Sequence, residues 1–380
     1  MLLSIVIAQK RAERKGAKMK WSDGYRMRCL LVGFVAVVVP GSGTAKADFT
    51  FGEPTNLGPT VNSSVRDYAP TSSADGLSLY FDSARPGGYG DKDIWVTTRS
   101  TTNDPWEEPV NLGSIVNSSY DDVAPSISAN GLSLLFISRR PGGFGERDIW
   151  VTTRPSINDP WGEPVNLGPP VNTSYRESGV CISADGLELY FNSDRPGGSG
   201  AADLWVSTRS AIEDDWDTPV NLGPILNTSS SDDGPNISSD GLCLFFSVYG
   251  SENDYDTWMS TRPNKEHPWS IPVNLGLTVN SSARDMQPDI SFDGSTLYFS
   301  SRRSGGLGDY DLWQAPVIPI VDLNGDGIVD AADMCIMVDY WGTDEPLCDI
   351  GPMPWGDGIV DVQDLIVLAE HLFEEVPVAQ

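Results

Sequence analysis

The apolar residues between positions 50 and 317 fall into short clusters that recur at one spacing. One copy runs from Val123 to Gly168 and contains four clusters, VAPSIS, LSLLFIS, RDIWVTTR and WGEPVNLG. In RDIWVTTR the side chains of Ile149 and Val151 point to one face of a strand and that of Trp150 to the other. The pattern predicts four short β-strands per unit. Successive units are 55, 55, 55 and 53 residues apart, measured between the equivalent asparagines Asn56, Asn111, Asn166, Asn221 and Asn274.

An Asn-Gly or Asp-Gly pair separates the first two clusters of every unit. Both residues of such a pair accept positive φ, so we expect two-residue hairpin turns. Antiparallel hairpins at a fixed period are typical of β-propeller blades, whereas a sandwich lacks the period and a solenoid lacks the turns. The sequence therefore predicts an all-β five-bladed propeller over residues 48–317. The expected turns are Asp75-Gly76, Asn130-Gly131, Asp185-Gly186, Asp240-Gly241 and Asp293-Gly294.

The fourth cluster is offset relative to the other three. One copy, FGEPTNLG (Phe51–Gly58), precedes the first unit, and none follows the last unit, which stops at DLWQAPV (Asp311–Val317). We expect Phe51–Gly58 to supply the missing outer strand of the fifth blade. Such a strand would join the two ends of the ring and cover an otherwise unpaired sheet edge.

The consensus SADGLxLYFxSxRPGGxGxxDIWVTTR resembles the TolB-type, WD-repeat-like propeller repeat of secreted bacterial proteins. The resemblance covers roughly residues 50–317. It implies the propeller fold but little about function, because one fold hosts many activities.

The segment 1–47 has the features of a secretory signal. Arg26 and Arg28 precede the apolar run Cys29–Val39, and Ala45-Lys46-Ala47 forms an A-x-A cleavage site. The run is shorter than the roughly 20 residues that span a bilayer, although an anchor helix is the alternative. We therefore expect secretion to the cell surface, the extracellular space or the periplasm, with no membrane span in the mature chain.

The whole chain has a formal net charge of −28, and removing the basic segment 1–47 makes it more negative. Such a surface repels nucleic acid, so nucleic-acid partners are not expected. Cysteines are too few for a disulfide scaffold. Cys181 and Cys243 lie in strand-like apolar clusters and are expected to be buried thiols, whereas pairing of Cys335 with Cys348 stays open.

Several polar residues recur in every unit, and each has a structural interpretation. The aspartate two positions before each strand tryptophan accepts hydrogen bonds, and the asparagine of each NSS or NTS triplet caps a turn. A further carboxylate lies five residues after that asparagine. It either caps the same turn or belongs to a ring of acids at the channel mouth that holds a cation or polar ligand. The candidate ligand-binding acids are Asp67, Asp122, Glu177, Asp232 and Asp285; the arginines of the RPGG-type loops, Arg85, Arg140, Arg195 and Arg303, could balance their charge.

The C-terminal segment contains a calcium-binding pattern. In DLNGDGIVDAAD (Asp322–Asp333) oxygen ligands fall at positions 1, 3, 5, 7, 9 and 12, a spacing that folds them around one hard cation. MPWGDGIVDVQD (Met353–Asp364) repeats the pattern imperfectly, because Met353 and Trp355 replace the first two ligands. The expected Ca²⁺ ligands are Asp322, Asn324, Asp326, Ile328 through its carbonyl, Asp330 and Asp333 in the first loop, and Asp357, Asp361 and Asp364 in the second.

Paired loop-helix units of this kind resemble a type I dockerin over residues 321–374, after a linker at 318–320 and before a tail at 375–380. The resemblance implies a small helical domain that folds with calcium and docks to a cohesin-type protein module. Ala331-Ala332 and Val362-Gln363 fall where dockerins vary their partner-contacting residues.

These features favour a secreted, non-catalytic binding or assembly protein whose propeller binds a glycan or a cell-surface protein. No catalytic residue is assigned. A propeller glycoside hydrolase needs carboxylates in unlike environments, whereas the repeated acids are nearly equivalent. With only His267 and His371 available, a propeller Ser-His-Asp triad or His-rich zinc site has no parts. The alternatives kept open are such a polysaccharide-active enzyme and a structural envelope protein of Tol type.

Overall fold

The computed structural model describes residues 49–250, 254–319, 321, 323, 328–343, 348, 350–351 and 359–372. The predicted signal segment 1–47 lies outside the described residues.

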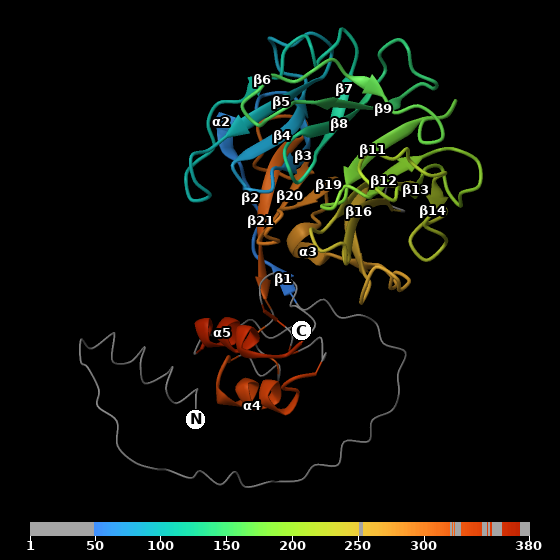
Figure 1. The fold of residues 1–380 in the computed structure, drawn as a ribbon. Coiled ribbons are helices and arrows are strands. Elements are labelled where there is room, and N and C mark those ends of the chain that lie inside the picture. The colour runs from blue at the N-terminus through green and yellow to red at the C-terminus, as the bar shows by residue number, and fades with distance from the viewer. Residues whose placement is uncertain are drawn as a thin grey trace, which may run out of the picture. The chain divides into compact units, whose positions relative to one another are not determined.

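Five antiparallel sheets form a five-bladed propeller, which confirms the predicted architecture (Figure 1). In blades 1–4 the strands follow chain order from the inner to the outer edge. Blade 1 holds β3 (Asp67–Ser72), β4 (Ser78–Ser83), β5 (Asp93–Thr98) and β6 (Val110–Asn111). Blade 2 holds β7 (Asp122–Ile127), β8 (Ser133–Ser138), β9 (Asp148–Thr153) and β10 (Val165–Asn166).

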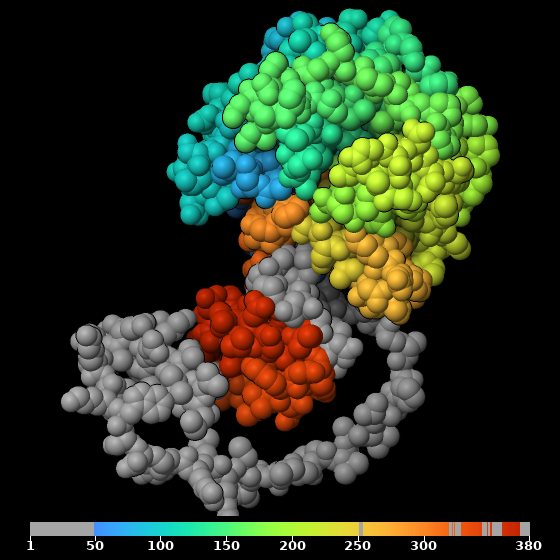
Figure 2. Space-filling model, in the orientation of Figure 1, coloured from blue at the N-terminus to red at the C-terminus, as the bar shows by residue number. Residues whose placement is uncertain are grey.

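The next two blades repeat this order. Blade 3 holds β11 (Glu177–Ile182), β12 (Glu188–Ser193), β13 (Asp203–Thr208) and β14 (Val220–Asn221). Blade 4 holds β15 (Asp232–Ile237), β16 (Cys243–Tyr249), β17 (Tyr255–Thr261) and β18 (Val273–Asn274). Single-turn helices α2 (Gly58–Val61) and α3 (Gly276–Val279) lie in connecting segments. In Figure 2 the blades follow one another around the propeller from blue through green and yellow to orange.

Blade 5 is assembled from both ends of the propeller sequence, as the offset repeat predicts. It contains β19 (Asp285–Ile290), β20 (Thr296–Ser301) and β21 (Asp311–Pro319), and both β1 (Phe49–Phe51) and β2 (Thr55–Asn56) pair antiparallel with β21 (Figure 1). The closing segment is thus longer than expected: it begins at Phe49, and β21 continues to Pro319, through residues that the sequence assigned to the linker.

Side-chain hydrogen bonds reinforce this closure. Asn56 Nδ2 donates to Asp311 Oδ2 over 2.9 Å, and the Asn62 amide bonds both the N–H and the carbonyl of Leu312. The same bonds recur in the other blades: the Asn117 side chain, for example, accepts the N–H of Ile94 and donates to its carbonyl. Because Asn62 and Asn117 are buried, this confirms the capping interpretation of the NSS triplets.

Alternating strand residues pack on the two neighbouring blades. Ile149 of β9 packs with Val180 and Phe191 of blade 3, whereas Trp150 packs with Ile94 of blade 1. The aspartate that precedes each such tryptophan organises the adjacent glycine loop. Asp93, for example, accepts hydrogen bonds from two loop N–H groups and from the side chain of the outer-strand asparagine.

The hairpins are where predicted, but the predicted turn type is wrong. Gly76 has a φ of +68°, whereas Asp75 is not among the residues with positive φ. The turn instead spans Ser73 to Gly76, closed by a Gly76 N–H to Ser73 carbonyl bond, and Asp75 Oδ1 accepts the N–H of Leu77. This aspartate cap satisfies the backbone without the strained conformation, so only glycine takes positive φ.

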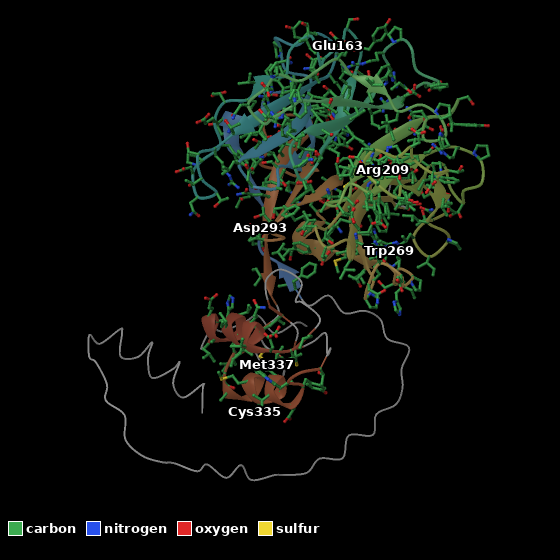
Figure 3. All side chains as sticks on the ribbon, viewed as in Figure 1. Glu163, Arg209, Trp269, Asp293, Cys335 and Met337 are labelled. Atoms are coloured by element: carbon green, nitrogen blue, oxygen red, sulfur yellow. The ribbon has the colours of Figure 1, made fainter. Side chains whose placement is uncertain are left out.

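The C-terminal segment contains two helices with matching N-termini. Helix α4 (Ala331–Asp339) begins after Asp330 and α5 (Val362–Glu370) begins after Asp361, each through a capping box with the aspartate three residues on. Both helices start before the apolar runs suggested by the sequence, because the loop carboxylates cap them. Figure 3 shows Cys335 and Met337 on α4.

The four described cysteines form no disulfide. Cys181 and Cys243 are buried thiols, as expected, whereas Cys335 is exposed and Cys348 is buried. Among the helices in the described part of the chain, none is long and apolar enough to cross a bilayer.

Truncation of Phe51 tests the closure. Phe51 is 8% exposed and packs in a core cluster with Phe299 and Trp313, so Phe51→Ala should lower the free energy of unfolding by about 3–5 kcal/mol. Thr50→Ala, on the exposed face of the same strand, should change it by less than about 0.5 kcal/mol. Urea denaturation measures both. Equal effects of the two variants would mean that β1 does not hold the ring closed.

Candidate functional site

The five repeated acids proposed from the sequence are buried, with no exposed surface. In blade 1, Asp67 accepts hydrogen bonds from the N–H and Oγ of Ser63 and from Ser83 Oγ, and it pairs with Arg85 at 2.6 Å. Blades 2, 3 and 5 repeat the ion pair through Arg140–Asp122, Arg195–Glu177 and Arg303–Asp285, at 2.6–2.8 Å. The structure therefore places these acids in the turn-capping arrangement, bonded within their own blades.

Blade 4 departs from this pattern, because it has no RPGG loop. Asp232 accepts hydrogen bonds from the backbone and hydroxyl of Thr228, but among the described residues it forms no ion pair. Burial raises its pKa to about 7. The same carboxylate position is therefore charge-balanced in four blades and isolated in one.

The inner strands surround a narrow axial channel. Near one end, position five of each inner strand contributes a different side chain, and bonds between them connect neighbouring blades. Asp289 accepts hydrogen bonds from Ser72 and Asn236, whose Oδ1 accepts the N–H of Ile290. Burial raises the Asp289 pKa to about 7. A cavity of about 50 Å³ touches this ring, which consists of Thr71, Ser126, Cys181, Asn236 and Asp289.

The opposite end of the channel carries the residues that differ most between repeats. Because the strands are antiparallel, inner strands begin, second strands end and third strands begin at this end of every blade. We call the residues there the rim. Its members are Arg66, Tyr68, Asp82 and Lys92 in blade 1; Asp121, Val123, Ile137, Arg139 and Arg147 in blade 2; Arg176, Ser178, Asn192 and Asp194 in blade 3; Asp233, Ser247, Tyr249 and Tyr255 in blade 4; and Arg284, Met286, Ser300, Arg302 and Tyr310 in blade 5.

Rim residues from different blades converge on the axis. Tyr68 contacts Met286 through its hydroxyl and meets Tyr310 edge-on, with ring centroids 4.9 Å apart. Burial, and then the charge of Asp233 from blade 4, raises the Tyr68 pKa well above its usual value. Asp233 in turn lies in the field of Arg176. The rim is thus one connected polar cluster.

Three buried polar atoms of the rim have no hydrogen-bond partner within the described structure: Asp82 Oδ2, Asn192 Oδ1 and Arg147 Nε. Asp82 is fully buried; its Oδ1 accepts the N–H of Ala124, and its Oδ2 is 3.6 Å from Arg66. Burial raises the Asp82 pKa, and Arg66 opposes that rise. Buried polar atoms without a hydrogen bond are costly. The indole Nε1 atoms of the repeated strand tryptophans Trp95, Trp150, Trp205 and Trp313 also have no partner among the described residues.

Sequence reasoning missed the rim because it followed the positions that the repeats share. Asp82 aligns with Ile137, Asn192, Ser247 and Ser300, and a comparison of the units for such differences would have found it. Asp82 and Asp233, from different blades, are acids that the repeat does not share, and burial raises the pKa of each.

The predicted calcium ligands are only partly described. Asp322, Asn324, Asp326 and Asp357 lie outside the described residues. Asp330 and Asp361 are helix caps, the buried Asp333 and Asp364 complete their capping boxes, and Ile328 is 48% exposed. The last two acids of each predicted loop thus lie together at a helix start. Within the described part, no group of three His, Cys, Asp or Glu side chains could hold a metal.

Comparison with known proteins identifies the fold alone. No family model and no curated protein matches the sequence. Among solved structures, the catalytic domain of the Coprinopsis cinerea GH62 α-L-arabinofuranosidase matches with a TM-score of 0.50 and 13% identity, over 70% of this chain and 97% of that one. The Podospora anserina α-L-arabinofuranosidase PaAbf62A, in complex with cellotriose, gives 0.50 and 14%, over 72% and 100%.

TolB from Acinetobacter baumannii is also similar, with a TM-score of 0.43 and 14% identity over 72% of this chain. The present chain spans 64% of that TolB structure.

Neutralising Asp232 and Asp122 separately tests the difference between blades. Asp122→Asn should lower the free energy of unfolding by about 3–5 kcal/mol at neutral pH, because it leaves the mostly buried Arg140 without its counter-charge. Asp232→Asn should not destabilise the protein at about pH 8, because it replaces an ionised carboxylate that burial disfavours.

The pH dependence has a definite sign. The folded-state pKa of Asp232, about 7, lies above the ordinary aspartate value of 3.8. Its stabilising contribution is therefore complete below about pH 4 and is lost as the pH rises through about 7. Urea denaturation at about pH 5 and about pH 8 should show a smaller loss of stability in Asp232→Asn than in the wild type. If Asp232→Asn and the wild type lose the same stability between these two pH values, the raised pKa of Asp232 is contradicted.

Proposed function

We propose that the chain is a secreted, non-catalytic binding protein whose propeller holds a polar ligand at the rim. The observation that carries the proposal is the loss of repeat symmetry there. Fold-determining residues recur in the blades, whereas the rim residues differ from blade to blade, and three of their buried polar atoms have no hydrogen-bond partner among the described residues. The repeated strand tryptophans share that last feature, so the proposal depends on the loss of symmetry at the rim.

The ligand site proposed here differs from the repeated acids first considered. Asp67, Asp122, Glu177, Asp232 and Asp285 are as buried as Asp82, but their carboxylate oxygens are already bonded to neighbouring serines, threonines or arginines, which leaves no acceptor for a ligand. The rim includes half-buried and exposed groups beside its buried ones, so a ligand can reach it. For a glycan, Asp82 and Asn192 would accept hydroxyl hydrogens.

The C-terminal segment is proposed as a dockerin-like module that binds Ca²⁺ and docks to a cohesin-type partner. Two features support this part of the proposal: the regular ligand spacing in Asp322–Asp333 and the matched capping boxes that open α4 and α5. With the secretory features of residues 1–47, the module would attach the propeller to an extracellular or cell-surface assembly.

A glycoside hydrolase is the second candidate. Asp82 and Asp233 favour it, since they come from different blades and burial raises the pKa of each. Two carboxylates in unlike environments are what glycosidases use. Release of reducing sugar that both Asp82→Asn and Asp233→Asn abolish would establish hydrolysis; no release by the wild type would exclude it for the glycans tried.

Binding to a panel of oligosaccharides tests the rim. Asp82→Asn keeps the bond to Ala124 but puts an amide donor where an acceptor was, so affinity for a bound glycan should fall about tenfold or more. Asp185→Asn, at an exposed hairpin turn of blade 3, should leave it unchanged. Calorimetry measures both. If Asp82→Asn binds like the wild type, the ligand does not use the rim; if no glycan, peptide or cohesin is retained, a structural envelope protein becomes the better interpretation.

Chelation tests the calcium proposal. EDTA should unfold residues 321–374 and leave the propeller intact, because loop carboxylates without a cation repel one another. Asp326→Ala should weaken Ca²⁺ binding more than Asp357→Ala, because the first loop has its full ligand set. Far-ultraviolet circular dichroism follows the helices, and calcium titration gives the affinities. A helical signal indifferent to EDTA would contradict the metal assignment.

A further inference from the structure

Half of the basic residues of the propeller fall into two repeated structural groups. Arg85, Arg140, Arg195 and Arg303 pair with the buried ring of acids. A second group stacks its guanidinium groups on tryptophans of the outer clusters; Arg209, which lies over Trp216, and Trp269, which lies under Arg262, are labelled in Figure 3. The rest, apart from Lys265, belong to the rim: Arg66, Lys92, Arg139, Arg147, Arg176, Arg284 and Arg302. A strongly acidic chain thus gathers its remaining positive charge at one end of the channel.

Arg147 shares its nearby acids with other basic residues. Asp121 is 3.9 Å from Arg147 Nη2 and lies closer to Lys92, at 3.2 Å, and the charge of Asp233 acts on both Arg176 and Arg147. Arg176 is joined to Arg147 by a backbone bridge between blades 2 and 3. Burial, followed by the charges of Arg139 and Arg176, lowers the Arg147 pKa. The Nε of Arg147 is buried and has no acceptor among the described residues, so this corner of the rim has an unused donor among several basic groups.

Two buried acceptors of the rim have no hydrogen bond among the described residues. One is Oδ2 of Asp82 in blade 1, which is 3.6 Å from Arg66 Nη2 and whose partner oxygen Oδ1 accepts a backbone N–H of blade 2. The other is Oδ1 of Asn192 in blade 3. Both side chains are at least 98% buried. A free inorganic anion such as sulfate brings no donors and would leave both acceptors unsatisfied. A ligand that complements the rim must carry hydroxyl or amide hydrogens beside its negative charge.

Aromatic rings complete the rim. Tyr68 and Tyr310 are buried, and Tyr249 and Tyr255 are partly buried with ring centroids 5.0 Å apart. Arg66 and Arg302 lie over Tyr68 and Tyr310, at 3.9 and 4.3 Å from the ring centroids. Rigid rings of this kind offer flat apolar surface beside polar groups, which suits the mixed faces of a sugar ring.

We propose that the rim binds an acidic saccharide, a sugar that bears a carboxylate. Its carboxylate would accept hydrogen bonds from Arg147 and Arg176, and its hydroxyls would donate to Asp82 and Asn192. Arginine suits this role because its planar fork matches a carboxylate. This inference rests on the proposed function and specifies the chemistry of its ligand.

The test compares oligogalacturonate with its methyl-esterified form, which has the same hydroxyls but no charge. Calorimetry on the full chain should show binding of the acid and at least about tenfold weaker binding of the ester, the loss expected for a charge-assisted contact. Arg147→Gln should weaken binding of the acid by a similar factor. Lys265→Gln, the same charge change at an exposed site away from the rim, should leave it unchanged.

The outcomes distinguish failure of the acidic-saccharide inference from failure of the proposed function. Equal binding of acid and ester, or tighter binding of neutral oligosaccharides, would overturn the acidic ligand while a glycan-binding rim stands. Sulfate or phosphate that displaces oligogalacturonate at equal concentration would overturn it too, by revealing a simple anion site. If no saccharide binds, the proposed function itself fails. Should Arg147→Gln not fold, Arg176→Gln replaces it, and the acid-ester comparison needs no variant.

Discussion

Antiparallel pairing of β1 and β2 with β21 is the interaction on which the rest of the propeller depends. Without it, blade 5 would have three strands and β21 would expose its outer edge. A ring also constrains every blade, because each must fill one sector and meet two neighbours. The repeated contacts hold the blades in these sectors. Asn62 and Asn117 donate hydrogen bonds to the backbone of the adjoining third strand, and Trp150 packs on the preceding blade. Fixed residues therefore recur wherever a blade touches another.

The rim residues differ more between blades. Asp82 and Ser300 each accept a backbone N–H of the next blade, so contacts between blades persist there, but different residue types make them. This variation explains why five similar units can build one asymmetric site. Blade 4 shows the exception, since the loss of its loop arginine leaves Asp232 without an ion pair and with a raised pKa. Departure from the repeat changes the electrostatics at the rim as well, where burial raises the pKa of Asp82 and of Asp233.

The strands and the ring closure could be predicted from the sequence. The strands follow from the periodicity of the apolar clusters, and the closure follows from the one offset cluster. It was insufficient where chemistry depends on burial. Both Asp67 and Asp82 are buried acids, yet Asp67 bonds to Ser63, Ser83 and Arg85, whereas Asp82 keeps an oxygen without a hydrogen bond. No spacing rule distinguishes them. The turn prediction failed for a related reason. The side chain of Asp75 accepts the backbone N–H of Leu77, and residue type alone does not tell this arrangement from a turn with positive φ at Asp75.

The acidic surface and the basic rim act over different distances. Charges on the exposed surface are screened beyond about 10 Å at ordinary ionic strength. The net charge of −28 therefore weakens the long-range attraction of an acidic polymer without cancelling a direct contact with Arg147. Inside the rim, partial burial reduces screening and strengthens each ion pair. A protein with this charge distribution would reject polyanions that touch only its surface and retain those that present a carboxylate to the channel mouth. Selectivity then depends on fit at the rim and not on overall charge.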